Sequence, residues 1–131
     1  MGQTLTEKLL ARRSGKTGVA AGETLWVDVD VLMTHDVCGP GTIGVFKREF
    51  GEKALVWDPD RIVIIPDHYI FTSDSMSNRN VDTLRAFVKE QKIRWFYDVI
   101  DDPDGTWRFD ASKGPLKRQY GSRFAGVCHT A

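Results

Sequence analysis

Residues 61–68 read RIVIIPDH, a nearly continuous β-branched run that stops at a proline and is followed by an aspartate and a histidine. Such a run is typical of a strand that is buried on both faces of an α/β sheet. The preceding segment 58–60 (DPD) is a turn signal. We therefore expect a buried strand over Arg61–Ile65, with Asp67 and His68 just beyond its carboxyl end.

Three other segments have the character of strands. In Leu25–Leu32 (LWVDVDVL) valine alternates with aspartate, which is the period of a half-buried strand. Ala54–Trp57 (ALVW) and Ile93–Val99 (IRWFYDV) are mainly apolar. We expect strands over all three segments, and we expect residues 34–42, which are rich in glycine and proline, to form a loop.

Helices are predicted between these strands. Residues 4–13 begin with TLTE, which has the threonine-to-glutamate spacing of a capping box. Pro40 can start a second helix that ends at Gly51, and apolar residues at helical spacing predict a third helix over roughly 78–92. Strands that alternate with helices favour an α/β fold, in which helices flank a layered sheet.

The composition is that of an ordinary globular protein. The chain has 131 residues, about the size of one domain, with 41% apolar and 27% charged residues. Eighteen basic residues balance eighteen acidic ones, which argues against a nucleic-acid binder. The N-terminus lacks the apolar segment of a signal peptide, and no apolar run approaches the roughly 20 residues that cross a bilayer. We therefore predict a cytoplasmic protein that binds neither nucleic acid nor membranes.

The three histidines are the best candidates for chemistry. His68 and His35 each follow a predicted strand, and His129 lies near the end of the chain. In open α/β sheets, functional groups collect beyond the carboxyl ends of the strands. Asp67 can fix the tautomer of the neighbouring imidazole and hold its proton, although adjacent strand residues point apart and the pair needs a bend. Each histidine also has a purely structural interpretation, as a loop or strand-end residue, and both interpretations stay open here.

Other chemistry has weak support. The histidines lack the HxH or HxxxH spacing of a zinc site, so no metal ligand is predicted. Cys38 and Cys128 are each near a histidine in sequence, yet we expect both to be small buried apolar residues. Residues 15–17 (GKT) lack the first glycine and the preceding strand of a phosphate-binding loop. No G-x-S-x-G is present, which argues against an α/β hydrolase.

Six sequence elements together resemble one known family. They are TLTEKLLARRSG (4–15), VAAGETLWVDVDVLMTHDVCGPGTIGVF (19–46), DPDR (58–61), PDH (66–68), FYDV (96–99) and GVCH (126–129). In this order they resemble the N-terminal part of the large subunit of 3-isopropylmalate dehydratases and homoaconitases, in the aconitase superfamily. The resemblance covers about residues 3–100 and 125–131, and it implies the first part of the aconitase-type large-subunit fold.

The resemblance also implies roles for individual residues. Asp67 and His68 match the family's aspartate–histidine pair, which takes part in binding the substrate hydroxyl and in proton handling. His129 matches a histidine that helps to manage the departing hydroxyl, and His35 lies where the family carries a substrate-binding residue. The implied reaction is the reversible dehydration and rehydration of a hydroxy acid such as isopropylmalate. In the complete enzyme, three cysteine thiolates hold a four-iron, four-sulfur cluster whose open iron acts as a Lewis acid.

This sequence departs from the family pattern in several places. It has two cysteines, neither in a position that matches a cluster ligand, and it lacks the family's DSH element. Residues 101–124 resemble an insertion, a loop or a short hairpin, between an α/β region over 1–100 and the start of the G-(I/V)-x-H element at 125–131. We therefore expect this chain alone to carry no cluster.

Two hypotheses about function follow. In the first, the chain is the N-terminal part of a hydro-lyase and needs two partners, namely the rest of the large subunit and a small subunit with the swivelling domain. The isolated chain is then incomplete and inactive. In the second, the chain is a truncated non-catalytic relative that acts as a binding or interaction module, and the missing cysteines favour this alternative.

Overall fold

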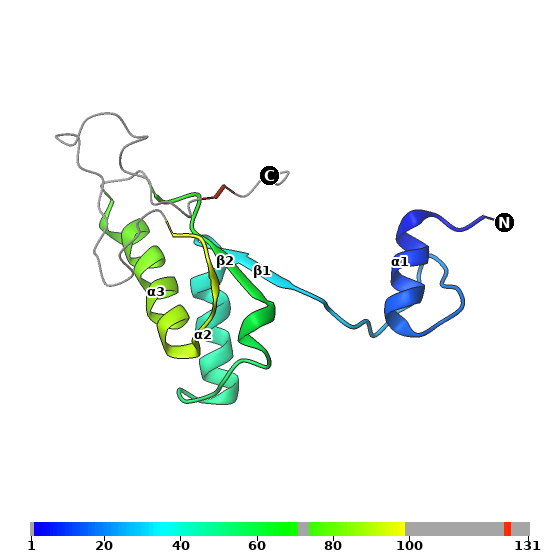
Figure 1. Cartoon of the computed structure of the whole chain (residues 1–131), viewed down its shortest axis with the longest axis horizontal. Helices are drawn as coiled ribbons and strands as arrows, with labels where there is room; N and C mark the ends of the chain where they lie inside the picture. Colours follow the sequence, from blue (N-terminus) through cyan, green and yellow to red (C-terminus); the bar gives the residue numbers. More distant parts are fainter. Residues whose placement is uncertain (1, 71–73, 99–124, 127–131) are drawn as a thin grey trace. The chain divides into compact units, whose positions relative to one another are not determined.

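The computed structural model describes residues 2–70, 74–98 and 125–126 (Figure 1). They belong to two compact units, Met1–Val31 and Leu32–Ala131, which we describe separately. The segment 101–124, predicted to be an insertion, and His129 both lie outside the described residues.

The first unit is built on helix α1, Leu5–Ser14. The predicted capping box is confirmed, because the Thr4 hydroxyl accepts the Glu7 N–H while the Glu7 carboxylate accepts the Thr4 N–H. Gly15 ends the helix in the left-handed region at φ 69°, a conformation that glycine adopts without steric cost. The helix thus has well-defined signals at both ends.

The strand predicted over Leu25–Leu32 is wrong. Residues 25–31 are not in a strand, and Trp26 is 95% exposed. The segment is instead tied to the end of α1, because the Asp28 N–H donates to the Arg13 carbonyl and Asp30 pairs with the Arg13 guanidinium. Alternation describes side chains that face two environments, but a strand also needs a neighbouring backbone to pair with, and pairing begins only at Leu32.

The second unit is a parallel three-stranded sheet with helices between its strands (Figure 1). Its elements are β1 (Leu32–His35), α2 (Gly39–Phe50), the 3₁₀ turn η1 (Pro59–Arg61), β2 (Ile62–Ile65), α3 (Ser75–Gln91) and β3 (Trp95–Phe96). The strand order is β1-β2-β3, and α2 and α3 lie side by side along one face of the sheet. The α/β fold class, with a layered sheet and flanking helices, is confirmed.

Some boundaries differ from the sequence expectation. The predicted strand over Ala54–Trp57 is absent, because the Val56 N–H and the Ala54 carbonyl are paired with the side chain of Gln91 instead of a neighbouring strand. Helix α3 starts before residue 78, since the Asp74 carboxylate accepts the Ser77 N–H and caps the helix there. Hydrophobic periodicity alone did not place these two boundaries correctly. The buried Gln91 side chain determines the first, and the Asp74 N-cap determines the second.

The core fills the space between the sheet and the two helices. It consists of Ile43, Ile62, Ile64, Leu84, Phe87, Ile93 and Phe96. As expected, β2 is the most buried strand, with only Val63 at an intermediate exposure. At the end of the sheet, Arg85 of α3 makes two hydrogen bonds to the buried Asp98 carboxylate, at 2.7 and 2.9 Å.

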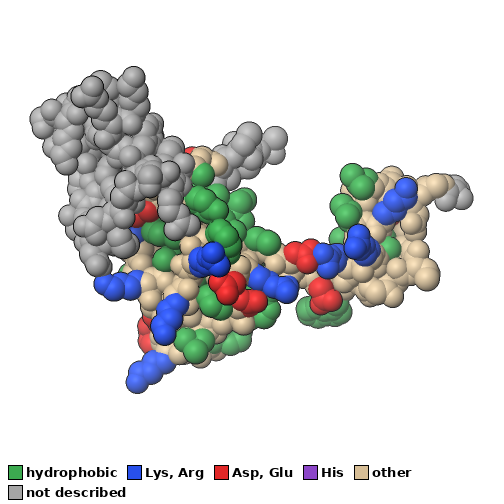
Figure 2. Space-filling model, in the orientation of Figure 1, with side chains coloured by type: hydrophobic (Ala, Val, Ile, Leu, Met, Phe, Trp, Pro, Cys, Tyr) green, Lys and Arg blue, Asp and Glu red, His purple; other side chains and the backbone are tan. Residues whose placement is uncertain are grey.

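Hydrophobic side chains are also found on the surface of each unit (Figure 2). Leu5 and Trp26 are exposed in the first unit, and Leu32 and Met33 of the edge strand β1 are each at least half exposed in the second. Within the described ranges, no helix has the length and apolar character needed to cross a membrane. Each unit, taken by itself, therefore presents apolar side chains on the surface of its described residues.

Candidate functional site

The candidate site lies at the carboxyl edge of the parallel sheet. β1 ends at His35, which is in register with Ile65, the last residue of β2. Pro66 stops β2, and Asp67 and His68 follow directly. Parallel strands present their carboxyl ends at the same edge, so two segments far apart in sequence come together, as the sequence predicted.

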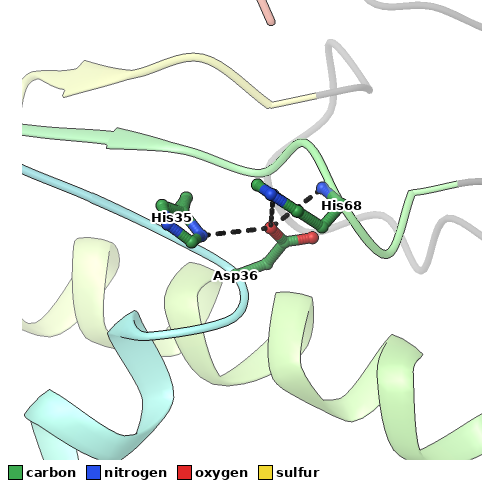
Figure 3. Close-up of side chains that lie close together, drawn as sticks. All are labelled: His35, Asp36 and His68. Carbon is green, nitrogen blue, oxygen red and sulfur yellow. Dashed lines mark hydrogen bonds and ion pairs between the residues drawn. The ribbon is translucent and has the colours of Figure 1, made fainter. Parts of the chain in front are cut away.

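His35 and His68 are in direct contact across this edge (Figure 3). Their ring centroids are 4.6 Å apart and the ring planes differ by 23°, which is a stacked arrangement. The side chains are 17% and 30% exposed, so both rings are shielded yet reachable from solvent. The structure thus brings together two of the three histidines that the sequence singled out.

Asp36 lies beneath the two rings and is completely buried. Its Oδ1 accepts the backbone N–H groups of Asp67 and His68 at 3.2 and 3.0 Å, and its Oδ2 accepts that of Tyr69 at 2.6 Å. A buried carboxylate is costly unless hydrogen bonds compensate its lost hydration, and here three backbone donors do so. Asp36 therefore ties the end of β1 to the turn that follows β2.

This turn supplies the bend that Asp67 and His68 need to act together. Asp67 Oδ2 lies 3.7 Å from His68 Nδ1, and Asp36 Oδ1 lies 3.5 Å from the same nitrogen. One ring nitrogen of His68 thus faces two carboxylates. The turn therefore brings both carboxylates to the same edge of the His68 ring.

His35 has a different environment, although Asp36 Oδ1 is 4.0 Å from its Nδ1. The same Nδ1 accepts the N–H of Val37 at 3.3 Å, within the loop that leads into α2. A distance of 4.0 Å is too long for a hydrogen bond, so Asp36 is not a hydrogen-bond partner of this nitrogen, whereas the Val37 N–H is.

A third segment approaches the same edge at Gly126. A Cβ atom built on Gly126 would lie 3.2 Å from Asp67 Oδ1, closer than an ordinary van der Waals contact. Gly126 therefore lies beside the Asp67 carboxylate. His129 itself lies outside the described residues, and its role stays a prediction.

The group could in principle hold a cation. One ligand atom from each of His35, Asp36 and His68 lies within 4.8 Å of the others, and two histidines with one carboxylate form a known ligand set for divalent metals. However, both oxygens of Asp36 are engaged by backbone donors and the residue has no exposed surface. The geometry favours a carboxylate that orders the protein over one that binds a metal.

Sequence reasoning missed Asp36. The signal that could have found it is the mirrored order of the pairs, His35-Asp36 after one strand and Asp67-His68 after the next. The expectation of a buried Cys38 is also wrong, because Cys38 is exposed at the start of α2. A largely apolar cavity of about 290 Å³ lies nearby between β1, β2 and α2, and neither histidine lines it.

Comparison with known proteins decides the family. The chain is 55% identical over 130 residues to the chloroplastic large subunit of 3-isopropylmalate dehydratase from Arabidopsis thaliana, which covers 99% of this chain. It is 48% identical over 99 residues to the probable large subunit from Methanothermobacter thermautotrophicus, and 33% identical over 99 residues to the 2,3-dimethylmalate dehydratase large subunit of Eubacterium barkeri. No family model matches the chain.

The chain belongs to the family of 3-isopropylmalate dehydratase large subunits. This places it in the aconitase superfamily and confirms the resemblance drawn from the sequence elements. The match is to the N-terminal part of these large subunits, and the chain spans about 23% of the length of the relatives named above.

The residues of this family member do not fit an iron–sulfur cluster on their own. A cluster of the kind expected for the complete enzyme needs three cysteine thiolates, and the whole sequence has two cysteines. Among the described residues, Cys38 is the sole cysteine, and it is not part of a metal-ligating group. The cluster therefore cannot be assembled from the side chains of this chain alone.

Proposed function

We propose that this chain is the N-terminal portion of a hydro-lyase large subunit that isomerises a hydroxy acid, such as isopropylmalate, by dehydration and rehydration. The identity of 55% to the Arabidopsis large subunit supports the reaction class. The Eubacterium relative is named for 2,3-dimethylmalate, so a substituted malate is the shared substrate class.

Four residues carry the proposed chemistry. His68, held by Asp67, binds the substrate hydroxyl and handles its proton. His35 binds the substrate beside it, and His129 helps to manage the departing hydroxyl. The observation that supports this most strongly is the stacking of His35 and His68 over the buried Asp36 carboxylate. A purely structural histidine needs no such partner, whereas two convergent imidazoles at a sheet edge suit acid–base chemistry.

Other parts of the enzyme come from outside this chain. We propose that the remainder of a large subunit supplies the cluster thiolates and that a small subunit supplies the swivelling domain. Relatives of which this chain matches only about 23% support the first point, and their description as large subunits supports the second. The apolar surface of Leu32 and Met33 on β1 is consistent with further protein packing there.

The cytoplasmic location stays a prediction. The Arabidopsis relative is described as chloroplastic, so the plastid is the competing compartment. Imaging a fluorescent fusion of the full protein in a plant cell distinguishes the two.

A complementation experiment tests the proposed function. Residues 2–98 of this chain replace the matching segment of the Arabidopsis large subunit, and the chimera is produced with its small subunit under anaerobic conditions. We expect formation of the unsaturated acid, measured by its absorbance, and a loss of about 10²–10⁴-fold in kcat when His68→Ala is introduced. Lys53→Ala, at an exposed position, serves as the control and keeps full activity. A folded, cluster-loaded chimera that is inactive contradicts the proposal.

The alternative function is a non-catalytic interaction module. The exposed apolar side chains of Leu32 and Met33 on β1 are the observation that fits it. The chimera experiment gives different results for the two functions. A module leaves every chimera inactive and still binds a partner, whereas a hydro-lyase segment restores turnover.

A further inference from the structure

One edge of the parallel sheet is open among the described residues. The strand order is β1-β2-β3, so β1 pairs with β2 on one side and with no described strand on the other. An edge strand presents a row of backbone N–H and C=O groups that can pair with another strand. The described sheet is also small, since its three strands compare with about four to six in most sheets.

The two edges of this sheet differ in how they are protected. Natural edge strands are kept from further pairing by charged residues, by proline or by being very short. β3 is two residues long and directly follows Arg94. β1 has four residues, LMTH, without a lysine, an arginine, an acidic residue or a proline, and Leu32 and Met33 are 50% and 54% exposed. β1 is therefore the edge that is suited to accept a further strand.

The apolar cavity of about 290 Å³ opens at this same edge. Its inner wall is formed by buried residues of β2 and α3, such as Ile62, Ile64 and Phe87. The exposed lining residues all belong to β1 or to the start of α2, and they are Leu32, Met33, Cys38 and Thr42. The mouth of the cavity therefore lies beside β1.

The cavity has the size and chemistry of a pocket for a large apolar side chain. An apolar cavity of roughly 150 Å³ in another protein holds a benzene ring, so this cavity has room for a phenylalanine or a leucine. Leu32 and Thr34 of β1 line it together with their register partners in β2. Every second residue of a strand faces the same side of a sheet. A strand next to β1 therefore also directs alternate side chains to this side, where the cavity can receive one.

We propose that the sheet continues past β1, where a strand from the part of the large subunit that this chain does not match pairs with the open edge and places an apolar side chain in the cavity. The inference rests on the proposed function for the identity of the partner. This chain matches about 23% of its relatives, so most of a large subunit remains to supply the strand. In doubly wound α/β sheets, later strands are added on the free side of the first strand, which is this position.

Such a strand has a consequence for the candidate site. His35 is the last residue of β1, and parallel strands end at a common edge of the sheet. Residues that follow a parallel strand beside β1 therefore lie next to the stacked rings of His35 and His68. The docking of this strand completes one wall of the site as well as the apolar core.

Cys38 reports whether the cavity is covered, because it lines the cavity and is exposed in this chain. The full chain and the full-length chimera described above are treated with N-ethylmaleimide. Mass spectrometry of the tryptic peptide that contains Cys38 follows its modification with time, so other cysteines do not interfere. We expect Cys38 to react at least about tenfold more slowly in the chimera, since a thiol reacts only where the reagent reaches it. Equal rates in the two proteins overturn the proposal.

Hydrogen exchange tests the pairing itself. A loop or a helix could cover Cys38 without pairing with β1, whereas a strand also protects backbone N–H groups of Leu32–His35. We expect the peptide that contains β1 to exchange about tenfold more slowly in the chimera than in this chain. Ile62–Ile65 of β2, which has a strand on each side in both proteins, is the internal reference and should change much less. A protected Cys38 with unchanged exchange in β1 overturns the added strand.

Leu32→Asp tests the apolar contact, because it places a charge at the mouth of the cavity on a side chain that is half exposed. In this variant of the chimera we expect Cys38 to regain the reactivity that it has in the isolated chain. Leu55→Asp is the matched control, since Leu55 is exposed and does not line the cavity, and it should keep Cys38 protected. Undiminished protection in a folded Leu32→Asp chimera contradicts the proposal. Should that variant fail to fold, the comparison of the two unsubstituted proteins still decides.

The remaining outcomes separate other occupants and the proposed function. Protection of Cys38 in the isolated chain that increases with protein concentration assigns the edge to a second copy of this chain and overturns the proposal. An active chimera in which Cys38 and β1 stay as accessible as in the isolated chain overturns the proposal and leaves the hydro-lyase function intact. An inactive chimera in which both are protected supports the added strand and contradicts the function.

Discussion

His68 lies over the ring of His35 because the Asp36 carboxylate, one residue after His35, binds the backbone N–H of His68. The two histidines are thus linked through the main chain as well as through their rings. A single buried residue connects the ends of two parallel strands and so determines where both imidazoles lie. This arrangement makes the site sensitive to changes that do not touch either ring.

The first prediction concerns the cluster. Anaerobic reconstitution of this chain alone is expected to yield no four-iron, four-sulfur cluster, because two cysteines cannot supply three thiolates. Iron and sulfide analysis after gel filtration measures the outcome, with the same treatment of a complete large subunit as the positive control. Stoichiometric iron and sulfide on the isolated chain would contradict the prediction.

The second prediction concerns the core between α3 and the sheet. Leu84 has no exposed surface, so Leu84→Ala leaves a cavity and is expected to lower the free energy of unfolding by about 2–5 kcal/mol. Leu55→Ala removes the same atoms from a side chain that is 77% exposed and should have little effect. Urea denaturation followed by circular dichroism compares the two variants, and equal losses would show that the core is placed wrongly.

The third prediction concerns the buried ion pair of Arg85 and Asp98. Asp98→Ala leaves the Arg85 guanidinium, whose side chain is 7% exposed, without the carboxylate that accepts two of its hydrogen bonds. We expect a loss of about 3–5 kcal/mol in the free energy of unfolding. Glu49→Ala breaks an exposed pair with Arg48 and is expected to cost less than about 1 kcal/mol. Thermal denaturation measures both, and a small effect of Asp98→Ala would contradict the burial of this pair.

The fourth prediction concerns the pH dependence of helix α3. The Ser77 N–H, which donates to the Asp74 carboxylate, lowers the pKa of Asp74 from its usual 3.8. A carboxyl whose pKa is lower in the folded state stabilises the fold above its unfolded pKa, and this contribution disappears as the pH falls through the folded value. Asp74→Asn keeps a capping acceptor but cannot titrate.

The measurement for this prediction is the free energy of unfolding of both proteins between about pH 7 and pH 2. The wild-type protein should lose more stability than Asp74→Asn below about pH 4, where the unfolded carboxyl takes up its proton. Parallel curves for the two proteins over that range would show that the cap is not formed.

Local signals in the sequence accounted for much of the fold. The capping box at Thr4 and Glu7, the end of α2 at Gly51 and the β-branched run of β2 all depend on residues close together in the chain, and each is present in the structure. The alternation of strands and helices was enough to predict a sheet with flanking helices. The position of His68 just beyond β2 also followed from local sequence, whereas His35, expected in a loop, is the last residue of β1.

Long-range pairing decided the rest. The pattern of Leu25–Leu32 is that of a strand, yet only Leu32 gains a partner, because β2 begins opposite it at Ile62. The segment Ala54–Trp57, predicted to be a strand, makes its hydrogen bonds to the side chain of Gln91 instead of to a neighbouring strand. Neither outcome can be read from a window of neighbouring residues, since each partner lies far away in the sequence.

The candidate site also depends partly on local sequence and partly on long-range contacts. The sequence by itself determined that His68 follows a strand and that Asp67 adjoins it, whereas His35, expected in a loop after a strand, is the last residue of β1. Only the tertiary structure decided that the two rings stack and that Asp36, an unremarked residue in a loop, is the buried carboxylate beneath them. The physical reason is that a buried charge is stable only where several donors converge on it, and these donors come from a segment that the fold, not the chain order, brings to Asp36.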